Sequence, residues 1–376
     1  MARVLISGAG IAGLTAALWL QRYGFEPVVI ERAPHPRGGG YLVSLSHFAY
    51  QYADELGVLK AMQERNMGIT HSSYHDMTGR ELLALDYQRL FAGVDVLQIM
   101  RDDVVDVLYL QAKSDIQIRF NESIEAVTEA SEAVQVEFAS GQQEHFDLLV
   151  IAEGQNSSTR NLVFPNDVSL DYLDLHCAAM RIPNTLGLSH KFETHMDQGR
   201  YMAAFNTPDG GLGCVFVWSS AERQIPAGPD KLSALEAAFR GSAKAIDTAL
   251  DSASAEGIYM DSLKQVNAST WHRGRTILIG DAAHCLTLFS GRGAAAAIAG
   301  ATRLARQVKQ SGIVEGIREF ETESRKILGP IQHQTKGAVR WYVPQTRTDR
   351  WLRNNGMRFL PNRLFEQYFK MKYSNV

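Results

Sequence analysis

A glycine-rich turn near the N-terminus has the residue spacing that binds a dinucleotide. Residues 8–13 read Gly-Ala-Gly-Ile-Ala-Gly, and they lie between the apolar run 4–6 and a segment with helical spacing of apolar residues. Such glycines permit a tight turn, close approach of the backbone to a pyrophosphate, and close packing of helix on strand. The free N–H groups at the helix start attract negative charge. The predicted contacts are Gly8, Gly10, Ile11, Ala12 and Gly13.

An acidic residue follows at the end of the next apolar run. Glu31 comes directly after residues 27–30, and Arg32, next to it, is assigned to the same site. A carboxylate at this position accepts hydrogen bonds from ribose hydroxyls and disfavours the 2′-phosphate of NADP. The turn by itself is compatible with FAD, with a nicotinamide dinucleotide, or with a purely structural role.

A second segment, residues 277–293, joins an apolar strand to Gly280-Asp281 and then to Gly291-x-Gly293 at the start of an alanine-rich helix. An aspartate at the carboxyl end of a strand can bind a polyol chain. The helix start can stabilise negative charge on a reduced flavin. Small residues such as Ala294 would let the backbone approach a flat ring.

Segment 277–293 strongly resembles the Gly-Asp motif of the p-hydroxybenzoate hydroxylase-like flavin monooxygenases. Residues 153–160, Glu-Gly-Gln-Asn-Ser-Ser-Thr-Arg, are similar to that family's signature Asp-Gly-x-x-Ser-x-x-Arg. The resemblance implies that FAD is the cofactor and that Asp281 holds its ribityl chain. It also implies that Arg101 contacts the flavin cofactor. The residues that it places beside both FAD and the approaching nicotinamide cofactor are Glu153, Gly154, Ser157 and Arg160.

The same resemblance implies a class A monooxygenase reaction. NADH or NADPH would reduce FAD, and O2 would then give a flavin C4a-hydroperoxide that hydroxylates an aromatic or polyketide-like small molecule. Residues 39–41 and 300–301 resemble the branch of tetracycline-inactivating and polyketide-modifying enzymes. The sequence departs from the family at Glu153, Leu288 and Arg292. An FAD-dependent oxidase or dehydrogenase without hydroxylation, or a non-catalytic flavoprotein, therefore stays open as an alternative.

No side chain is singled out as a catalytic base, and no set of residues has metal-ligand spacing. A histidine is more often structural than catalytic. We therefore expect hydrogen-bonded or surface roles for His47, His71, His75, His195 and His284. Three aromatic residues could line an apolar substrate cavity, although core packing is the more common role of such residues: Phe205, Phe216 and Trp218.

These motifs predict an α/β fold, α+β overall. It comprises a Rossmann-like FAD-binding domain of the glutathione-reductase type, an inserted β-sheet substrate domain and a C-terminal helical segment. The expected FAD-binding domain is discontinuous (1–72, 97–165 and 266–330), the substrate domain takes 73–96 and 166–265, and the helical segment takes 331–376. Residues 48–62 are expected to form one helix. Pro344 and Pro361 are expected to break the basic, aromatic tail, which either packs across both domains or contacts a membrane.

Composition limits the remaining possibilities. The 376 residues carry a net charge of −3, which gives no reason to expect nucleic acid as a partner. Three cysteines without CxxC spacing favour a reducing cytoplasm. The sequence contains no uncharged apolar run of about 18 residues, so no transmembrane helix is expected. The oligomeric state is undetermined.

Overall fold

The first three elements form a βαβ unit around the glycine-rich turn. The computed structural model describes residues 1–36 and 41–374, so Gly39 and Gly40 of the branch-like segment lie outside the described residues. Strand β1 (Arg3–Ser7) leads into helix α1 (Ile11–Arg22), and strand β2 (Glu26–Glu31) follows. The apolar side chains of both strands are buried, as expected for a parallel sheet covered on both faces.

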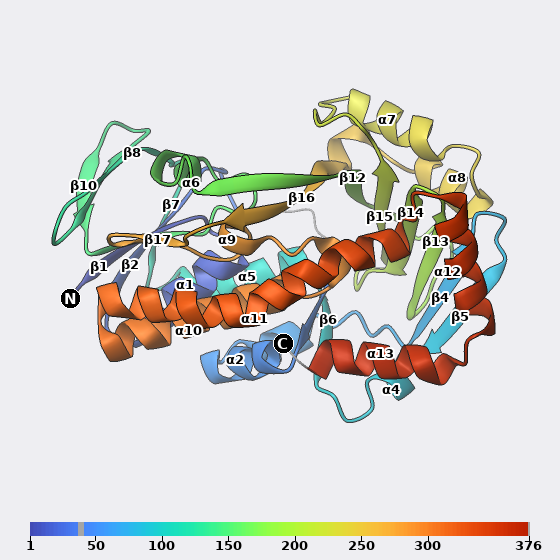
Figure 1. Cartoon of the computed structure of the whole chain (residues 1–376), viewed down its shortest axis with the longest axis horizontal. Coiled ribbons are helices and arrows are strands. Elements are labelled where there is room, and N and C mark those ends of the chain that lie inside the picture. The colour runs from blue at the N-terminus through green and yellow to red at the C-terminus, as the bar shows by residue number, and fades with distance from the viewer. Residues whose placement is uncertain (37–40, 375–376) are drawn as a thin grey trace.

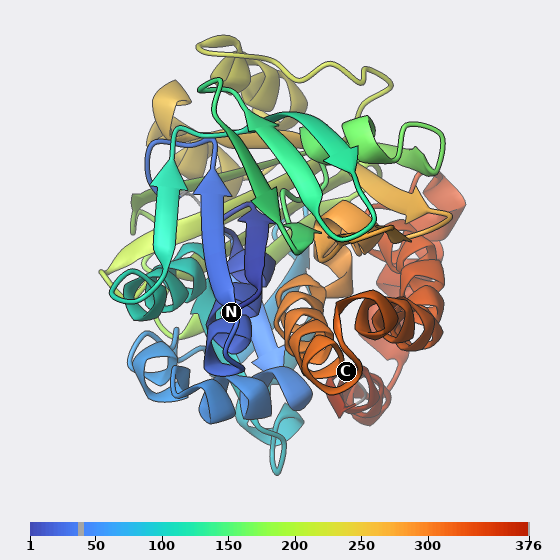
Figure 2. The ribbon, with the colours of Figure 1, turned by 90° about the vertical axis from the view of Figure 1, so that its left-hand side faces the viewer.

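A six-stranded sheet grows from this unit (Figure 2). Its order is β17-β18-β11-β1-β2-β7, and its pairs are parallel except β17 with β18. The added strands are β7 (Gln117–Phe120), β11 (Leu148–Ile151), β17 (His272–Arg273) and β18 (Thr276–Leu278). A separate antiparallel meander consists of β8 (Ile124–Glu129), β9 (Val134–Phe138) and β10 (Gln143–Phe146).

Helix α1 packs against two further helices, α5 (Arg101–Ala112) and α10 (Gly293–Ser311). The expectation of one helix over residues 48–62 is wrong. The segment forms α2 (Phe48–Leu56) and α3 (Leu59–Gln63), because Gly57 takes a left-handed φ of 83° and ends the first helix. Two short helices follow β11 and β18, namely α6 (Ser158–Val163) and α9 (Asp281–His284).

A small antiparallel sheet pairs β3 (Leu42–Ser46) with β6 (Val96–Met100). Successive side chains of a strand point to opposite faces. Val43 and Ile99 accordingly lie in the main hydrophobic core, whereas Ser44 and Gln98 line a cavity on the other face. The small sheet therefore separates the core from that cavity.

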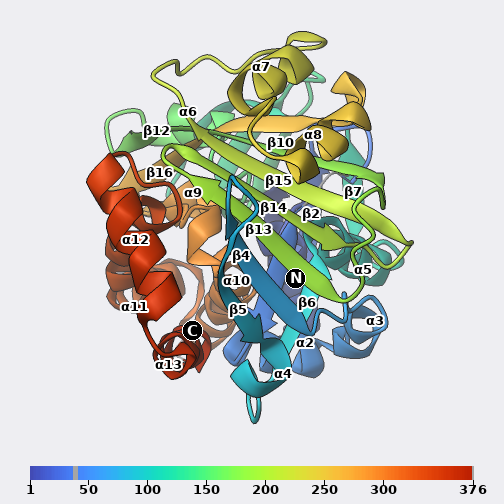
Figure 3. The same ribbon diagram turned by 90° about the vertical axis from the view of Figure 1, so that its right-hand side faces the viewer.

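The second large sheet has seven strands in the order β16-β12-β15-β14-β13-β4-β5. Figure 3 looks onto this sheet and shows α7 (Asp230–Phe239) and α8 (Lys244–Asp251) near one face. All its pairs are antiparallel except β13 with β4. Its strands are β4 (His71–Asp76), β5 (Glu81–Asp86), β12 (Val168–Pro183), β13 (Lys191–Asp197), β14 (Arg200–Asn206), β15 (Gly211–Ser219) and β16 (Tyr259–Ala268).

Three helices form the C-terminal end, and the first of them connects the two large sheets. Helix α11 (Ile313–Tyr342) runs from the parallel sheet toward the seven-stranded sheet, where α12 (Arg347–Phe359) lies beside β5 (Figure 1). Helix α13 (Asn362–Ser374) turns back and contacts β5 and α4 (Tyr87–Leu90). Pro344 and Pro361 lie in the two breaks, as predicted. The expected fold class, with a parallel sheet, a second sheet and C-terminal helices, is confirmed. None of the helices in the described ranges is long and apolar enough to span a membrane.

Candidate active site

The N-termini of three helices meet at one cavity, which we call the helix-end cavity. Ile11 of α1, Arg101 of α5 and Gly293 of α10 each line it. The first N–H groups of a helix lack intrahelical partners and carry partial positive charge. The cavity contains about 1580 Å³ of empty space, part of it open to solvent. Its electrostatics therefore suit a long ligand with negative charge.

The helix-end cavity gathers ten of the seventeen residues that the sequence assigned to cofactor binding. They are Gly10, Ile11, Ala12, Arg101, Glu153, Gly154, Asp281, Gly291, Gly293 and Ala294. The other seven lie around it without lining it, namely Gly8, Gly13, Glu31, Arg32, Ser157, Arg160 and Gly280.

The three glycines of the N-terminal turn have different surroundings. A Cβ atom at Gly10 would meet nothing within 4 Å, so this backbone is open to a ligand. A Cβ at Gly8 would lie 2.5 Å from the carbonyl oxygen of Ala152, and one at Gly13 would lie 1.9 Å from that of Gly8. Gly8 and Gly13 therefore serve close packing, while Gly10 leaves room in the cavity.

Asp281 opens helix α9 and exposes its carboxylate to the cavity. Enclosure by surrounding protein raises the pKa of Asp281 above its usual value, and the positive charge of Arg101 acts in the opposite direction. The preceding Gly280 has φ of 59°, and a Cβ there would lie 3.0 Å from the Cβ of Ala12. A bulkier residue at position 280 would thus press on the glycine-rich turn.

Glu31 and Arg160 hold the backbone around the cavity. The Glu31 carboxylate accepts hydrogen bonds from the N–H groups of Ala9 (3.1 Å) and Ala33 (3.0 Å). The buried Arg160 guanidinium donates to the carbonyl oxygens of Ala282 (3.3 Å) and Gln155 (3.0 Å). Arg32 is exposed at the end of β2.

The carboxylate of Glu153 accepts four hydrogen bonds from neighbouring residues. One carboxylate oxygen accepts hydrogen bonds from the hydroxyls of Ser7 and Thr159, both at 2.5 Å. The other accepts from the hydroxyl of Ser157 at 2.6 Å and from the N–H of Thr159 at 3.1 Å. The additional methylene, relative to aspartate, carries the carboxylate to β1.

The sequence analysis missed a polar cluster along the same cavity. Asp261 of β16 accepts hydrogen bonds from Gln155 (2.6 Å), Asn156 (3.1 Å) and the Tyr259 hydroxyl (3.1 Å). Lys264 donates to the Asn156 side chain at 2.5 Å. Asp261, Ser262 and Lys264 are polar residues interspersed with apolar ones in this strand and were a signal, but only the fold brings the strand beside residues 155–156.

A second cavity, the aromatic cavity, lies between the small sheet, the seven-stranded sheet and the C-terminal helices. It contains about 830 Å³ of empty space, part of it open to solvent. The described residues that line it are Tyr41, Leu42, Ser44, Tyr74, Tyr87, Gln98, Phe192, Tyr201, Ala203, Phe205, Val215, Leu288, Phe289, Gly291, Tyr342 and Phe369. An aromatic lining of this kind suits a flat apolar ligand.

The two cavities adjoin. Tyr41, Leu42, Leu288 and Gly291 line both of them. Burial raises the pKa of the Tyr41 hydroxyl above its usual value, so this group is neutral at physiological pH. Leu288, one of the departures from the family pattern, thus lies at the junction of the two cavities. Arg292, another departure, precedes α10 and lines neither.

Of the three aromatic candidates from the sequence, Phe205 lines the aromatic cavity. Phe216 and Trp218 point to the other face of the sheet, where both pack against Phe239 of α7. None of the five candidate histidines lines either cavity. Within the described ranges, no group of three or more His, Cys, Asp or Glu side chains is arranged to hold a metal ion.

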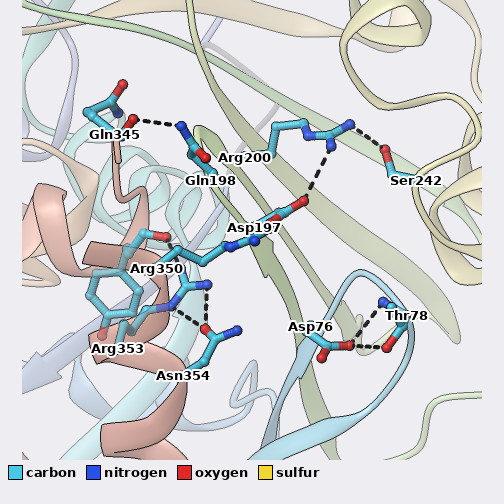
Figure 4. A network of polar contacts seen from close by, with 11 residues as sticks. Asp76, Thr78, Asp197, Gln198, Arg200, Ser242, Gln345, Arg350, Arg353 and Asn354 are labelled. Carbon is cyan, nitrogen blue, oxygen red and sulfur yellow. Dashed lines mark hydrogen bonds and ion pairs between the residues drawn. The ribbon is translucent and has the colours of Figure 1, made fainter. Parts of the chain in front are cut away.

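Helix α12 is fixed to the carboxyl end of β13, in the seven-stranded sheet, by the polar network in Figure 4. Arg350 donates to the Asp197 carboxylate at 2.6 Å. Arg353, only 1% exposed, donates to the carbonyl oxygen of Tyr342 at 3.2 Å and to the Asn354 side chain. Because the Tyr342 ring lines the aromatic cavity, this network fixes one wall of that cavity.

Comparisons with known proteins agree with this geometry. Residues 1–311 match the model of the FAD binding domain family. The chain is 30% identical over 322 residues to the uncharacterised protein Rv1260 of Mycobacterium tuberculosis, covering 83% of this chain and 86% of the relative. It is 29% identical over 314 residues to a flavin-dependent monooxygenase of Legionella longbeachae, covering 82% and 80%.

Two solved structures share the fold. The tetracycline destructase Tet(51) superimposes with a TM-score of 0.82 at 24% identity, covering 100% of this chain and 98% of the other. Klebsiella pneumoniae HpxO, solved with FAD and uric acid, has a TM-score of 0.88 at 18% identity, covering 99% and 96%. The chain therefore belongs to the FAD binding domain family, and it is an FAD-dependent monooxygenase.

Proposed function

We propose that the chain binds FAD in the helix-end cavity, takes reducing equivalents from NADH or NADPH, and uses O2 to hydroxylate an aromatic or polyketide-like molecule in the aromatic cavity. The observation that carries this proposal is the junction of the cavities at Tyr41, Leu42, Leu288 and Gly291. When bound, FAD would supply hydride acceptance and activation of O2. The surrounding residues would bind, orient and exclude water.

The residues that line the helix-end cavity fit FAD. Under this proposal the N–H groups at Gly10 to Ala12 and the side chain of Arg101 bind the pyrophosphate. Asp281 would accept hydrogen bonds from the ribityl hydroxyls, and the start of α10 at Gly293 and Ala294 would hold the flavin ring. The remaining predicted residues would either shape the glycine-rich turn, or lie near the adenosine part of FAD or the side from which the nicotinamide cofactor approaches. They are Gly8, Gly13, Glu31, Arg32, Glu153, Gly154, Ser157, Arg160, Gly280 and Gly291.

The proposal is tested by three measurements on one preparation. We expect FAD to bind, NADH or NADPH oxidation to accelerate with a suitable aromatic compound, and the product to gain oxygen from ¹⁸O2. An Asp281→Asn variant should bind FAD at least about tenfold more weakly, because it loses charge-assisted hydrogen bonds. The matched control is Asp54→Asn, whose side chain is exposed on α2. Hydrogen peroxide formed in place of an oxygenated product, with every compound tried, would contradict the hydroxylation.

A further inference from the structure

Two polar side chains face each other on one wall of the aromatic cavity. Ser44 of β3 pairs directly with Gln98 of β6, and both side chains line the cavity. Ser44 is 8% and Gln98 is 7% exposed, and within the described ranges neither side chain has a hydrogen-bond partner. Buried polar groups in proteins are almost always paired. The pair is therefore available to a ligand.

The fold itself does not require polar residues at these two positions. Val43, Leu45, Leu97 and Ile99 fill the core face of the same two strands. On the same face as the pair, Leu42, Met100 and Val96 are apolar, whereas Ser46 at the end of β3 is polar and buried. Aliphatic side chains would suit a buried strand at positions 44 and 98 equally well. A ligand-binding role explains the polar pair better than a structural role does.

The remainder of the lining restricts the charge of the ligand. None of the described residues that line the aromatic cavity is Asp, Glu, Lys, Arg or His. A carboxylate moved from water into such surroundings loses its hydration without gaining a cationic partner, which is costly. The cavity therefore disfavours acidic aromatic compounds.

The ring geometry restricts the shape of the ligand. Phe192 and Phe205 are stacked with centroids 5.6 Å apart and planes 3° apart, and Phe289 and Tyr342 are stacked at 5.2 Å and 11°. Tyr201 meets both Phe289 and Tyr342 edge-on. Parallel rings offer flat faces on which a planar ring system can stack.

We propose that the aromatic cavity selects an uncharged, planar, fused-ring substrate that carries a hydroxyl next to a carbonyl, and that Ser44 and Gln98 bind this edge. The Gln98 carboxamide both donates and accepts hydrogen bonds, and so does the Ser44 hydroxyl. The pair thus matches adjacent donor and acceptor groups, as in a hydroxyquinone or an enolised diketone. This inference rests on the proposed function, because it names the substrate class of that site.

A matched pair of probes tests the inference on the FAD-loaded protein without NADH or NADPH. The probes are 1,8-dihydroxyanthraquinone and its 3-carboxylic acid, and calorimetric titration gives each Kd. We expect the carboxylate to bind at least about 100-fold more weakly, since its charge would be buried without a partner. Gln98→Leu and Ser44→Ala should each weaken binding of the neutral probe about tenfold. Gln51→Leu, on the exposed face of α2, should leave it unchanged.

FAD content and thermal unfolding of each variant, measured on the same samples, separate lost recognition from lost folding. The inference is overturned if the carboxylate binds as tightly as the neutral probe, if both cavity variants bind like the wild type, or if neither probe binds. Any of these results, in a protein that holds FAD and is reduced by NADH or NADPH, would leave the proposed function intact. A protein that takes up no FAD would instead contradict the proposed function.

Discussion

The ring of Phe205 lies against the backbone of Gly213, its pairing partner on the neighbouring strand. A Cβ atom at Gly213 would be 2.3 Å from the Cε2 atom of the ring. The absence of a side chain at this one position lets the Phe205 ring lie across β15. There it stacks parallel to Phe192 and forms one wall of the aromatic cavity.

Gly213→Ala should therefore disturb the cavity and the fold together. The added methyl group must displace the ring or the strand, and overpacking of a buried site costs about 1–3 kcal/mol. We expect thermal unfolding to report that loss of stability. We also expect 1,8-dihydroxyanthraquinone to bind more weakly. Gly257→Ala is the control, because a Cβ there meets nothing within 4 Å. A Gly213→Ala protein as stable as this control would show that the ring is not confined.

The departure at position 153 should be structural. Glu153→Asp restores the residue of the family signature, but it shortens the side chain and should break the contact with Ser7. We expect a loss of about 1–2 kcal/mol in the free energy of unfolding. A double-mutant cycle with Ser7→Ala should show that the two changes are coupled. Glu125→Asp, on an exposed part of β8, is the control. A Glu153→Asp variant more stable than the wild type would refute this assignment.

Two glycines of one motif should respond differently to the same substitution. Gly13→Ala places a methyl group 1.9 Å from a carbonyl oxygen, so we expect a loss of stability of about 3 kcal/mol or more. Gly10→Ala meets open space, so stability should change by less than about 0.5 kcal/mol. Its methyl group enters the helix-end cavity and should weaken FAD binding about tenfold. Chemical denaturation and FAD titration of both variants check this. Equal effects on stability would contradict the assignment.

Stability should depend on pH through His284. Its ring packs against Trp271, and neither ring nitrogen has a hydrogen-bond partner in the described part of the chain. Burial lowers the pKa of His284 to about 4, whereas an unfolded histidine has a pKa of about 6.5. The unfolded chain therefore binds the proton more tightly. The neutral His284 ring therefore makes its full contribution to the free energy of unfolding above pH 6.5, and this contribution is lost as the pH falls toward 4.

Between pH 7 and pH 5, this linkage should remove about 2 kcal/mol from the free energy of unfolding. Urea denaturation at the two pH values measures the loss, and His284→Leu should reduce it. A hydrogen bond with His195 lowers the pKa of Glu193 to about 2. The Glu193 carboxyl group therefore titrates below the range from pH 7 to pH 5. An unchanged pH dependence in His284→Leu would mean that other groups are responsible.

The sequence predicted those parts of the site that lie within one continuous segment. The turn at Gly8 to Gly13 and the segment from Gly280 to Gly293 each combine a strand, a loop and a helix start, so their local pattern carries the signal. Gly57 ended a helix that was predicted to continue, although a glycine at a helix end is itself a known stop signal. The expected domain boundaries stay a prediction.

The parts that the sequence did not predict depend on pairing between distant segments. Gln98 interrupts an otherwise apolar strand, but only its pairing with Ser44 places both side chains in one cavity. Tyr342 and Phe369 belong to a tail that was expected to be helical, and nothing local showed that their rings reach the aromatic cavity. Phe205 and Phe216 looked equivalent because the strand register decides which face each one meets.

The visible absorption spectrum of the protein after FAD loading and removal of free FAD tests the central claim most directly. We predict the bands of oxidised flavin at one FAD per chain, and their bleaching when NADH or NADPH is added without oxygen. A protein that stays colourless, or that holds flavin which neither nicotinamide cofactor reduces, would contradict the account.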